Sequence, residues 1–299
     1  MKRFKICRMT GVLSLVLIMA LLMAGCGGAD KIVVGSKDFG ESIVLSEIFA
    51  QLIEAKTDLT VDRKLNMGGT FVCFEAIKNG DIDIYPEYTG TALTAQLGMD
   101  VITDPDEAYR TVSNAFDEQF GIRWLEPLGL NNTYTISVSD AVYQEYGIET
   151  FSDLAEISEN LIFGAEHEFF DRQDGYDGLT AAYNMTFKGD PQKMNISLKY
   201  QAIGNGDIDV TDSFATDGEI IQYNLHVLKD DKGFFPPYYA SPIIRNDTLE
   251  AHPELEEILN LLAGMIDDDT MIELNYKVSV QGQEADAVAA AFLQERGLI

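Results

Sequence analysis

A short motif occurs twice in this chain, and the repeat constrains the fold more than any other feature. The letters NGDID begin at Asn79 in the segment AIKNGDIDIYPEYTG and again at Asn205 in AIGNGDIDVTDSFATDG, 126 residues apart. Each copy predicts the end of a helix, an Asn-Gly turn and a short buried strand, at residues 82–85 and 208–211. Each strand leads into a loop that carries an aromatic residue. The chain therefore contains two related halves.

A second pair of segments supports the two halves. KIVVGSKDFGESIVLSEIFAQLIEA predicts a strand at residues 32–34, a Gly-Ser loop and an amphipathic helix from about Glu41. LIFGAEHEFFDRQDGYDGLTAAYN predicts a strand at residues 161–163, a Gly-Ala loop and a helix near Gly178. Ligands of open α/β sheets bind at the carboxyl ends of strands, so two such units that face each other form the walls of one cleft. We therefore expect an α/β protein of two lobes with a ligand cleft between them.

Two segments rich in turn-forming residues, LGLNNTY and GFFPPYYASP, are the expected crossings between the halves. They divide the chain into lobe 1, formed by residues 31–131 plus 240–299, and lobe 2, formed by residues 135–237. The part of lobe 1 that follows Pro253 predicts three helices.

Residues 1–25 have the pattern of an export signal, with a basic start and 13 nearly all apolar residues at 12–24. Such a run is too short to span a bilayer as a helix. The letters LMAGC resemble a bacterial lipobox, in which Cys26 would become the lipid-bearing first residue and residues 26–30 would link the anchor to the fold. The protein would then be held at the extracytoplasmic face of the cell membrane by its lipid. The alternative is a cleaved secretion signal with an incidental cysteine.

Composition and motifs argue against nucleic-acid binding and catalysis. The net charge of −28 is the opposite of what phosphate binding needs. His167 begins HEFFD, which matches half of a zinc-helix motif, but the second histidine is missing and the segment predicts a loop. The sequence contains no GxSxG turn and no phosphate-binding glycine loop. We expect no catalytic residue, no metal and no cofactor. Cys73, in the apolar stretch TFVCFEAI, is expected to be a buried thiol without a disulfide partner.

Aromatic residues gather in the loops that should face the cleft: Tyr85, Tyr88, Tyr134, Phe214, Tyr238 and Tyr239. Ring faces attract a quaternary ammonium group, which has no N–H to donate to a carboxylate. The alternative is that these rings pack in the core or at the hinge.

Two of the scarce basic residues, Lys37 in GSKDF and Arg172 in FFDRQDG, fall in loops of different lobes, and Thr91 follows Tyr88 by three positions. Together they are suited to hold a carboxylate. The alternative for the two cations is a place on the surface.

These segments, together with LNMGGTFVCFEAI, EPLGLNNTY and DSFATDG, resemble the substrate-binding lipoproteins of osmoprotectant ABC transporters, the glycine betaine/carnitine/choline-binding family. The resemblance covers nearly all of the chain after the signal and implies a periplasmic-binding-protein fold of type II. It implies an aromatic cage for the trimethylammonium group, formed by Tyr88, Tyr134, Phe214 and Tyr238 with the carbonyl of Asn132 nearby. It also implies a carboxylate clamp formed by Lys37, Thr91 and Arg172. Phe214 departs from the family, which commonly has tyrosine there.

The expected function is capture of a quaternary-ammonium osmoprotectant and its delivery to the transmembrane permease of an ABC transporter. Tyr85, Tyr200 and Tyr239 are assigned to packing first. Two alternatives remain open: a sensor or co-receptor of the same fold, which would need a signalling partner in place of a permease, and a lipid-anchored enzyme, which would need a substrate that is turned over.

Overall fold

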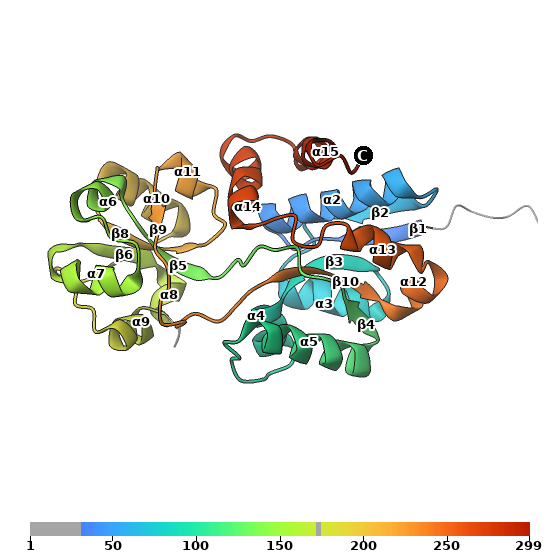
Figure 1. Ribbon diagram of the computed structural model, residues 1–299, viewed down its shortest axis with the longest axis horizontal. Coiled ribbons are helices and arrows are strands. Elements are labelled where there is room, and N and C mark those ends of the chain that lie inside the picture. The colour runs from blue at the N-terminus through green and yellow to red at the C-terminus, as the bar shows by residue number, and fades with distance from the viewer. Residues whose placement is uncertain (1–30, 172–174) are drawn as a thin grey trace, which may run out of the picture.

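The computed structural model describes residues 31–171 and 175–299, and these form two sheets of five strands each (Figure 1). The first sheet has the order β2-β1-β3-β10-β4, with β1 (Lys31–Gly35), β2 (Thr60–Lys64), β3 (Ile84–Tyr88), β4 (Ile122–Trp124) and β10 (Ala240–Arg245). The second has the order β7-β6-β8-β5-β9, with β5 (Tyr134–Val138), β6 (Phe163–Glu166), β7 (Gln192–Met194), β8 (Val210–Phe214) and β9 (His226–Val227). We call the first sheet with its helices lobe 1 and the second lobe 2. The protein is thus a two-lobed α/β fold.

The two sheets repeat the same pairing. In lobe 1, β1 lies parallel to β3 with Val34 opposite Ile84, and in lobe 2, β6 lies parallel to β8 with Phe163 opposite Val210. Each of β3 and β8 has an antiparallel strand on its other side, β10 and β5 respectively. β5 follows the first crossing between the lobes, and β10 follows the second. Each sheet therefore contains a strand that comes directly after the chain has crossed from the other lobe.

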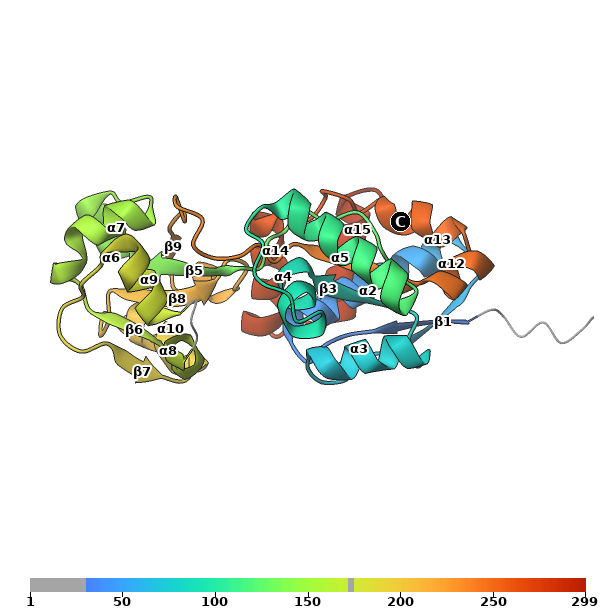
Figure 2. The same ribbon diagram turned by 90° about the horizontal axis from the view of Figure 1, so that it is seen from below.

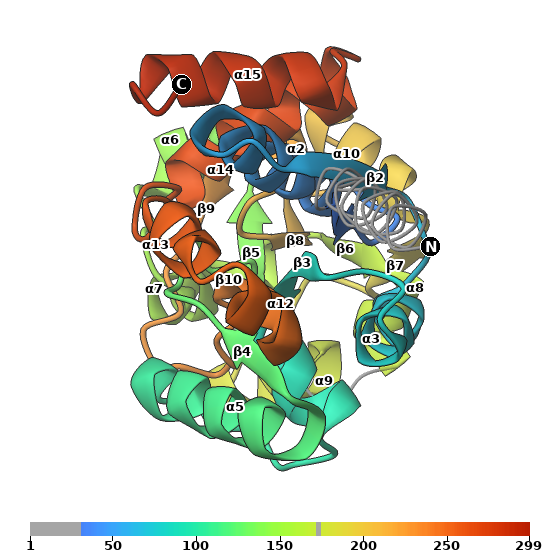
Figure 3. The same ribbon diagram turned by 90° about the vertical axis from the view of Figure 1, so that its right-hand side faces the viewer.

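Helices cover both faces of the lobe 1 sheet. They are α2 (Gly40–Lys56), α3 (Thr70–Asn79), α4 (Thr89–Thr91), the π-helix η1 (Ala92–Gln96), α5 (Pro105–Phe120), α12 (Asn246–Ala251), α13 (Glu254–Asn260), α14 (Asp268–Asn275), the π-helix η3 (Tyr276–Val280) and α15 (Ala285–Glu295). In Figure 3, α2 and α15 lie on one side of the strands and α5 on the opposite side. The three helices expected after Pro253 are α13, α14 and α15, with η3 added after α14.

Lobe 2 is the smaller unit, with α6 (Asp140–Tyr146), α7 (Phe151–Ile157), the 3-10 helix η2 (Ser158–Asn160), α8 (His167–Asp171), α9 (Tyr176–Tyr183), α10 (Ile196–Asn205) and α11 (Glu219–Gln222). The loop expected at His167 was wrong, because this segment forms α8 directly after β6. The helical turn buries Phe169 completely, 5.6 Å from the ring of Tyr134. Burial of that ring stabilises a turn which the local sequence alone does not specify.

The NGDID motif has one structural role in both lobes. Gly80 and Gly206 end α3 and α10 in the left-handed region, with φ of 77° and 78°, where glycine is favoured. Three residues later, a carboxylate oxygen of Asp83 accepts a hydrogen bond of 2.7 Å from the backbone N–H of Val33. Asp209 accepts the equivalent bond of 2.8 Å from Ile162. The motif therefore ends a helix and fastens the next strand to its neighbour.

Because turn and carboxylate occupy the first residues after each helix, the strands begin two residues later than expected, at Ile84 and Val210. They then run on to include the aromatic residues Tyr88 and Phe214, which the sequence had placed in loops.

The isoleucine of each NGDID motif explains why a neighbouring strand of the same lobe has glycine at the point of contact. A Cβ atom added at Gly35 would lie 2.6 Å from Cδ1 of Ile82, and one added at Gly164 would lie 2.8 Å from Cδ1 of Ile208. Both isoleucines are fully buried. Gly35 at the end of β1 and Gly164 within β6 thus make room for the same apolar contact in each lobe.

Two crossing segments, residues 125–133 and 228–239, connect the lobes side by side (Figure 2). The backbone N–H of Asn132 donates to the carbonyl oxygen of Tyr238 at 3.1 Å, and the N–H of Tyr238 donates to Oδ1 of Asn131 at 2.7 Å. A further link comes from the end of α14, where Nδ2 of Asn275 donates to the carbonyl oxygen of Thr216 at 2.7 Å. Within residues 31–171 and 175–299, we find no helix with the length and apolar character needed to cross a bilayer.

Candidate ligand-binding site

Tyr88 and Phe214 occupy the same place in the two halves of the molecule. Each is the last residue of its strand, β3 in lobe 1 and β8 in lobe 2, and the two are separated by the same 126 positions as the motifs. Tyr88 is 4% exposed, whereas Phe214 is half-buried. The carboxyl ends of the two strands therefore carry one ring from each lobe, at the edge where open α/β sheets bind their ligands.

Tyr134 adds a second ring to the lobe 2 side. It begins β5 directly opposite Phe214 in the antiparallel register, and the two ring centroids are 4.4 Å apart with their planes tilted by 38°. Its hydroxyl donates a hydrogen bond of 3.0 Å to Oε1 of Glu166, and its ring also contacts Phe169 and Phe235. Tyr134 thus belongs to the lobe 2 core as well as to the ring pair.

A buried carboxylate joins the lobe 1 ring to the first crossing, to the end of α14 and to lobe 2. Oε1 of Glu41, at the start of α2, accepts hydrogen bonds from the hydroxyl of Tyr88 at 2.7 Å and from Nδ2 of Asn132 at 2.9 Å. Its Oε2 accepts from the hydroxyl of Thr216 at 2.6 Å and from Nδ2 of Asn275 at 2.9 Å. Burial raises the pKa of Glu41, and the four hydrogen bonds that it accepts oppose that rise.

Lys37 does not present the free charge that a clamp would use. Its ammonium group makes an ion pair of 2.5 Å with Glu87, and only 3% of the residue is exposed. Glu87 also accepts hydrogen bonds from the hydroxyl of Tyr85 at 2.9 Å and from Gln96 at 2.7 Å. The ammonium group lies 5.1 Å from the ring centroid of Tyr88. Lys37 is therefore buried, and Glu87 neutralises its charge.

Lobe 2 contains a comparable pair. The ammonium group of Lys199, which is fully buried, lies 2.8 Å from Oδ2 of Asp212 and 3.9 Å from Oε2 of Glu166. It also lies 6.0 Å from the ring centroid of Phe214. In both lobes, then, a lysine held by a carboxylate sits behind the ring at the end of the central strand.

The other expected ligand residues within the described chain lie in the two crossings and in α4. Tyr238 lies in the second crossing, and its ring packs so closely on Gly90 that an added Cβ there would be 2.7 Å away. Thr91, the last residue of α4, is half-buried one position further along. Oδ1 of Asn132 is buried and has no hydrogen-bond partner among the described residues. Arg172 and Cys26 lie outside the described residues.

Sequence reasoning missed five buried charged residues around the rings: Glu41, Glu87, Glu166, Lys199 and Asp212. One of them carried a usable signal. Lys199 precedes the buried Tyr200 and lies one helical turn before the buried Ile203, so the phase of α10 places it on the apolar face. The expected packing roles hold for Tyr85 and Tyr200, which are buried, and for Cys73, whose burial raises the pKa of its thiol to about 11. Tyr239 is half-buried.

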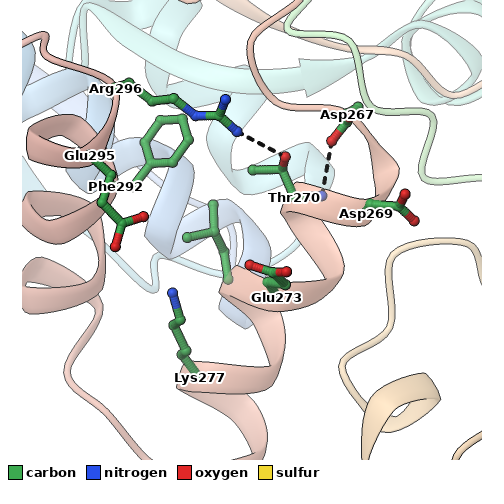
Figure 4. A pocket seen from close by; sticks show the side chains of 9 residues that line it. Asp267, Asp269, Thr270, Glu273, Lys277, Phe292, Glu295 and Arg296 are labelled. Carbon is green, nitrogen blue, oxygen red and sulfur yellow. Dashed lines mark hydrogen bonds between the residues drawn. The ribbon is translucent and has the colours of Figure 1, made fainter.

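Two hollows lie elsewhere on the described chain, and neither is lined by an expected ligand residue. A hollow of about 390 Å³ lies between α14 and α15, lined among others by Glu273, Lys277 and Arg296 (Figure 4), and it contains none of the expected ligand residues. Among residues 31–171 and 175–299, no group of three or more histidine, cysteine, aspartate or glutamate side chains is arranged to hold a metal ion.

The chain is similar to known proteins over most of its length. The chain is 39% identical over 277 residues to the carnitine transport binding protein OpuCC of Listeria monocytogenes, a match that covers 91% of this chain and 90% of that protein. It is 40% identical over 268 residues to the ergothioneine transport permease/ergothioneine binding protein EgtU of Helicobacter pylori, covering 89% of this chain but only 48% of that longer protein.

A solved structure is also close. The crystal structure of a glycine betaine/carnitine/choline ABC transporter protein superposes with a TM-score of 0.84 at 35% identity, over 89% of this chain and 99% of the other. The family model described as the substrate binding domain of ABC-type glycine betaine transport systems matches residues 30–295. The chain therefore belongs to this family of ABC-transporter substrate-binding proteins.

Proposed function

We propose that this protein binds a quaternary-ammonium osmoprotectant such as glycine betaine, carnitine or choline between its lobes and delivers it to an ABC permease. The observation that carries the proposal is the placement of Tyr88 and Phe214 at equivalent strand ends, with the ring centroid of Tyr134 4.4 Å from that of Phe214. Rings from both lobes are then available to one ligand. A cation in an aromatic cage gains roughly 0.5–2 kcal/mol from each well-placed ring once water is excluded.

Tyr238 completes the proposed cage from the second crossing, and the carbonyl of Asn132 lies on the neighbouring crossing, to which Tyr238 is hydrogen-bonded. Because the cage draws on both lobes, a ligand binds best when the two lobes hold all rings against it. Binding then shifts the population of lobe arrangements toward the closed one, which a permease can distinguish from the free protein.

The carboxylate end of a betaine needs a positive charge that is not already neutralised. Since Glu87 neutralises Lys37, the clamp of Lys37, Thr91 and Arg172 depends on Arg172 for its net charge. Arg172→Ala should therefore weaken glycine betaine by roughly 2–4 kcal/mol and weaken choline, which has no carboxylate, much less. An equal loss for both ligands would remove Arg172 from the clamp.

The proposal includes a lipid at Cys26 as the attachment to the membrane. Replacement of Cys26 by alanine should then release the protein from the membrane fraction of cells that express it. Retention of the Cys26→Ala variant in that fraction would contradict the lipid anchor. No observation in the described chain favours the sensor or the enzyme alternative over transport.

Titration calorimetry of the protein with glycine betaine, carnitine, choline and proline betaine tests the ligand class, with proline and histidine as controls. Tyr88→Ala and Tyr134→Ala should each weaken binding by roughly 1–3 kcal/mol, about 5- to 150-fold, because a ring is lost and water enters. Binding of proline or histidine alone would contradict the proposal. So would a variant that melts at a much lower temperature yet binds normally while folded, because its ring would then be a core residue.

A further inference from the structure

Two of the three tyrosines of the proposed cage, Tyr88 and Tyr134, donate their hydroxyl to a buried glutamate. In lobe 1 the hydroxyl of Tyr88 lies 2.7 Å from Oε1 of Glu41, and in lobe 2 the hydroxyl of Tyr134 lies 3.0 Å from Oε1 of Glu166. Each glutamate is 4% exposed. Neither residue is expected from the repeat or needed for a cage made of rings, so their presence behind both rings calls for a physical reason.

We propose that Glu41 and Glu166 are positioning residues that make the site select a permanent positive charge, because each fixes a ring and places a negative charge behind it. The inference rests on the proposed function and deepens it. It concerns the charge of the ligand, whereas a cage of rings alone would also accept a neutral group of the same shape.

The hydrogen bonds around Glu41 favour its ionised form. All four of its partners donate, and the two amide groups among them, from Asn132 and Asn275, cannot accept a proton from a neutral carboxyl group. None of the four donors is charged, and no ion pair of Glu41 occurs among the described residues. Burial raises the pKa of Glu41 and these hydrogen bonds oppose the rise, and in its ionised form no neighbouring cation cancels its charge, in contrast to that of Glu87.

The negative charge of Glu41 attracts a cation at the ring of Tyr88 in two ways. A phenol that donates to a carboxylate becomes richer in electrons, which strengthens the attraction between its face and a cation. The carboxylate also attracts the cation directly, and this attraction is weakly screened where water is excluded. Glu166 should act less strongly, because the ammonium group of Lys199 lies 3.9 Å from it.

The test compares two ligands of the same shape. Glycine betaine and 3,3-dimethylbutanoate share a carboxylate and a methyl-covered end, and they differ in a positive nitrogen against a neutral carbon. The ratio of their dissociation constants, measured by calorimetry, reports how strongly the site prefers the charge. Glu41→Gln should lower this preference about 5- to 50-fold, and Glu166→Gln about 2- to 10-fold.

Glu47→Gln is the matched control. Glu47 is another buried glutamate of α2, but its side chain accepts hydrogen bonds from Arg63 at 3.0 Å and from Gln51 at 3.3 Å instead of from a cage tyrosine. Its variant should keep the wild-type preference within twofold. If the Glu41→Gln protein does not fold, Tyr88→Phe takes its place, since it keeps the ring and breaks its link to the carboxylate. That variant should lower the preference about 2- to 5-fold.

An unchanged preference in the Glu41 and Glu166 variants, or in Tyr88→Phe, would overturn this inference alone, provided that the wild type binds glycine betaine. Equal weakening of both ligands would do the same, because it would reduce the glutamates to a structural role. If the wild type binds neither ligand, the proposed function fails and the inference fails with it.

Discussion

Lobe 1 and lobe 2 place charges of opposite sign at the same point of the repeat. Gly35 of β1 and Gly164 of β6 each make room for an isoleucine, and two residues later lobe 1 has Lys37 whereas lobe 2 has Glu166. The helix that leads into NGDID differs as well, because Cys73 of α3 corresponds to Lys199 of α10. Each of these buried charges has a partner of opposite sign in its own lobe, so a change at one of the positions alone would leave a buried charge without its partner.

The two lobes neutralise their buried lysine with carboxylates from different positions. In lobe 1 the cation comes from the strand end and the anion is Glu87, whereas in lobe 2 the cation comes from the helix and the anions are Asp212 and Glu166. In each case the lysine lies within 6.0 Å of the ring that ends the central strand. What the repeat preserves is therefore a compensated cation behind an aromatic ring, and not the identity of the residues that form it.

The largest effect should come from removing the lobe 2 cation. Lys199→Met leaves Asp212 and Glu166 without their lysine, which should cost about 3–5 kcal/mol of unfolding free energy. Lys37→Met should cost less, about 1–3 kcal/mol, because it leaves one carboxylate instead of two, and Glu87 keeps the hydroxyl of Tyr85 and the amide of Gln96 as partners. Urea unfolding of both variants checks the order, and a larger cost for Lys37→Met would show that the two pairs are not comparable.

A smaller effect on the free energy of unfolding should come from Asp217 of lobe 2 and should depend on pH. Burial raises the pKa of Asp217 from 3.8 to about 6, and this residue corresponds to the neutral Thr91 of lobe 1. Between these values the folded protein binds more protons than the unfolded chain, so this group lowers the free energy of unfolding as pH rises from about 4 to 7, by at most about 3 kcal/mol.

Asp217→Asn removes this titration and leaves a side-chain oxygen to accept from the backbone N–H of Phe214, now at 2.9 Å. The stability of the variant relative to the wild type should therefore rise between pH 4.5 and pH 7. Chemical unfolding at several pH values provides the measurement. Parallel profiles for the two proteins would show that the carboxylate of Asp217 is not perturbed in the folded state.

The smallest effect concerns the rings themselves. Phe214→Tyr makes the ring of lobe 2 chemically like Tyr88 of lobe 1 and should change the affinity for glycine betaine by less than about tenfold, since the ring face is kept and one hydroxyl is worth about 1 kcal/mol. Complete loss of binding would mean that the edge of Phe214 fills a tight apolar site against Tyr134.

The parts of the fold that were predictable from sequence are those fixed by local contacts. Gly80 must follow its helix in the left-handed region, and Ile82 must be buried next to it, so the letters alone identify the end of a helix and the turn. The start of β3 was misplaced by two residues because the side chain of Asp83 bonds to Val33, 50 positions away, and local patterns contain no trace of that contact.

In the candidate site, too, the residues that local sequence patterns identify were predictable, and those whose partners are distant in the sequence were not. The rings were predictable because they follow repeated strands, but the role of Glu41 was not, since its partners Tyr88 and Asn275 lie 47 and 234 positions away. An acidic residue in the first turn of a helix is also expected from the helix dipole, so its presence there gave no sign of a second role. The pairing of Lys37 with Glu87 was hidden for the same reason, at a separation of 50 positions.

The central claim, that one ligand is held by rings from both lobes, is tested most directly by a crystal structure of the protein with glycine betaine. The account predicts the ammonium nitrogen within about 6 Å of the ring centroids of Tyr88 from lobe 1 and of Phe214 and Tyr134 from lobe 2. A ligand bound with its ammonium group against the rings of one lobe only, or bound away from all three, would contradict it.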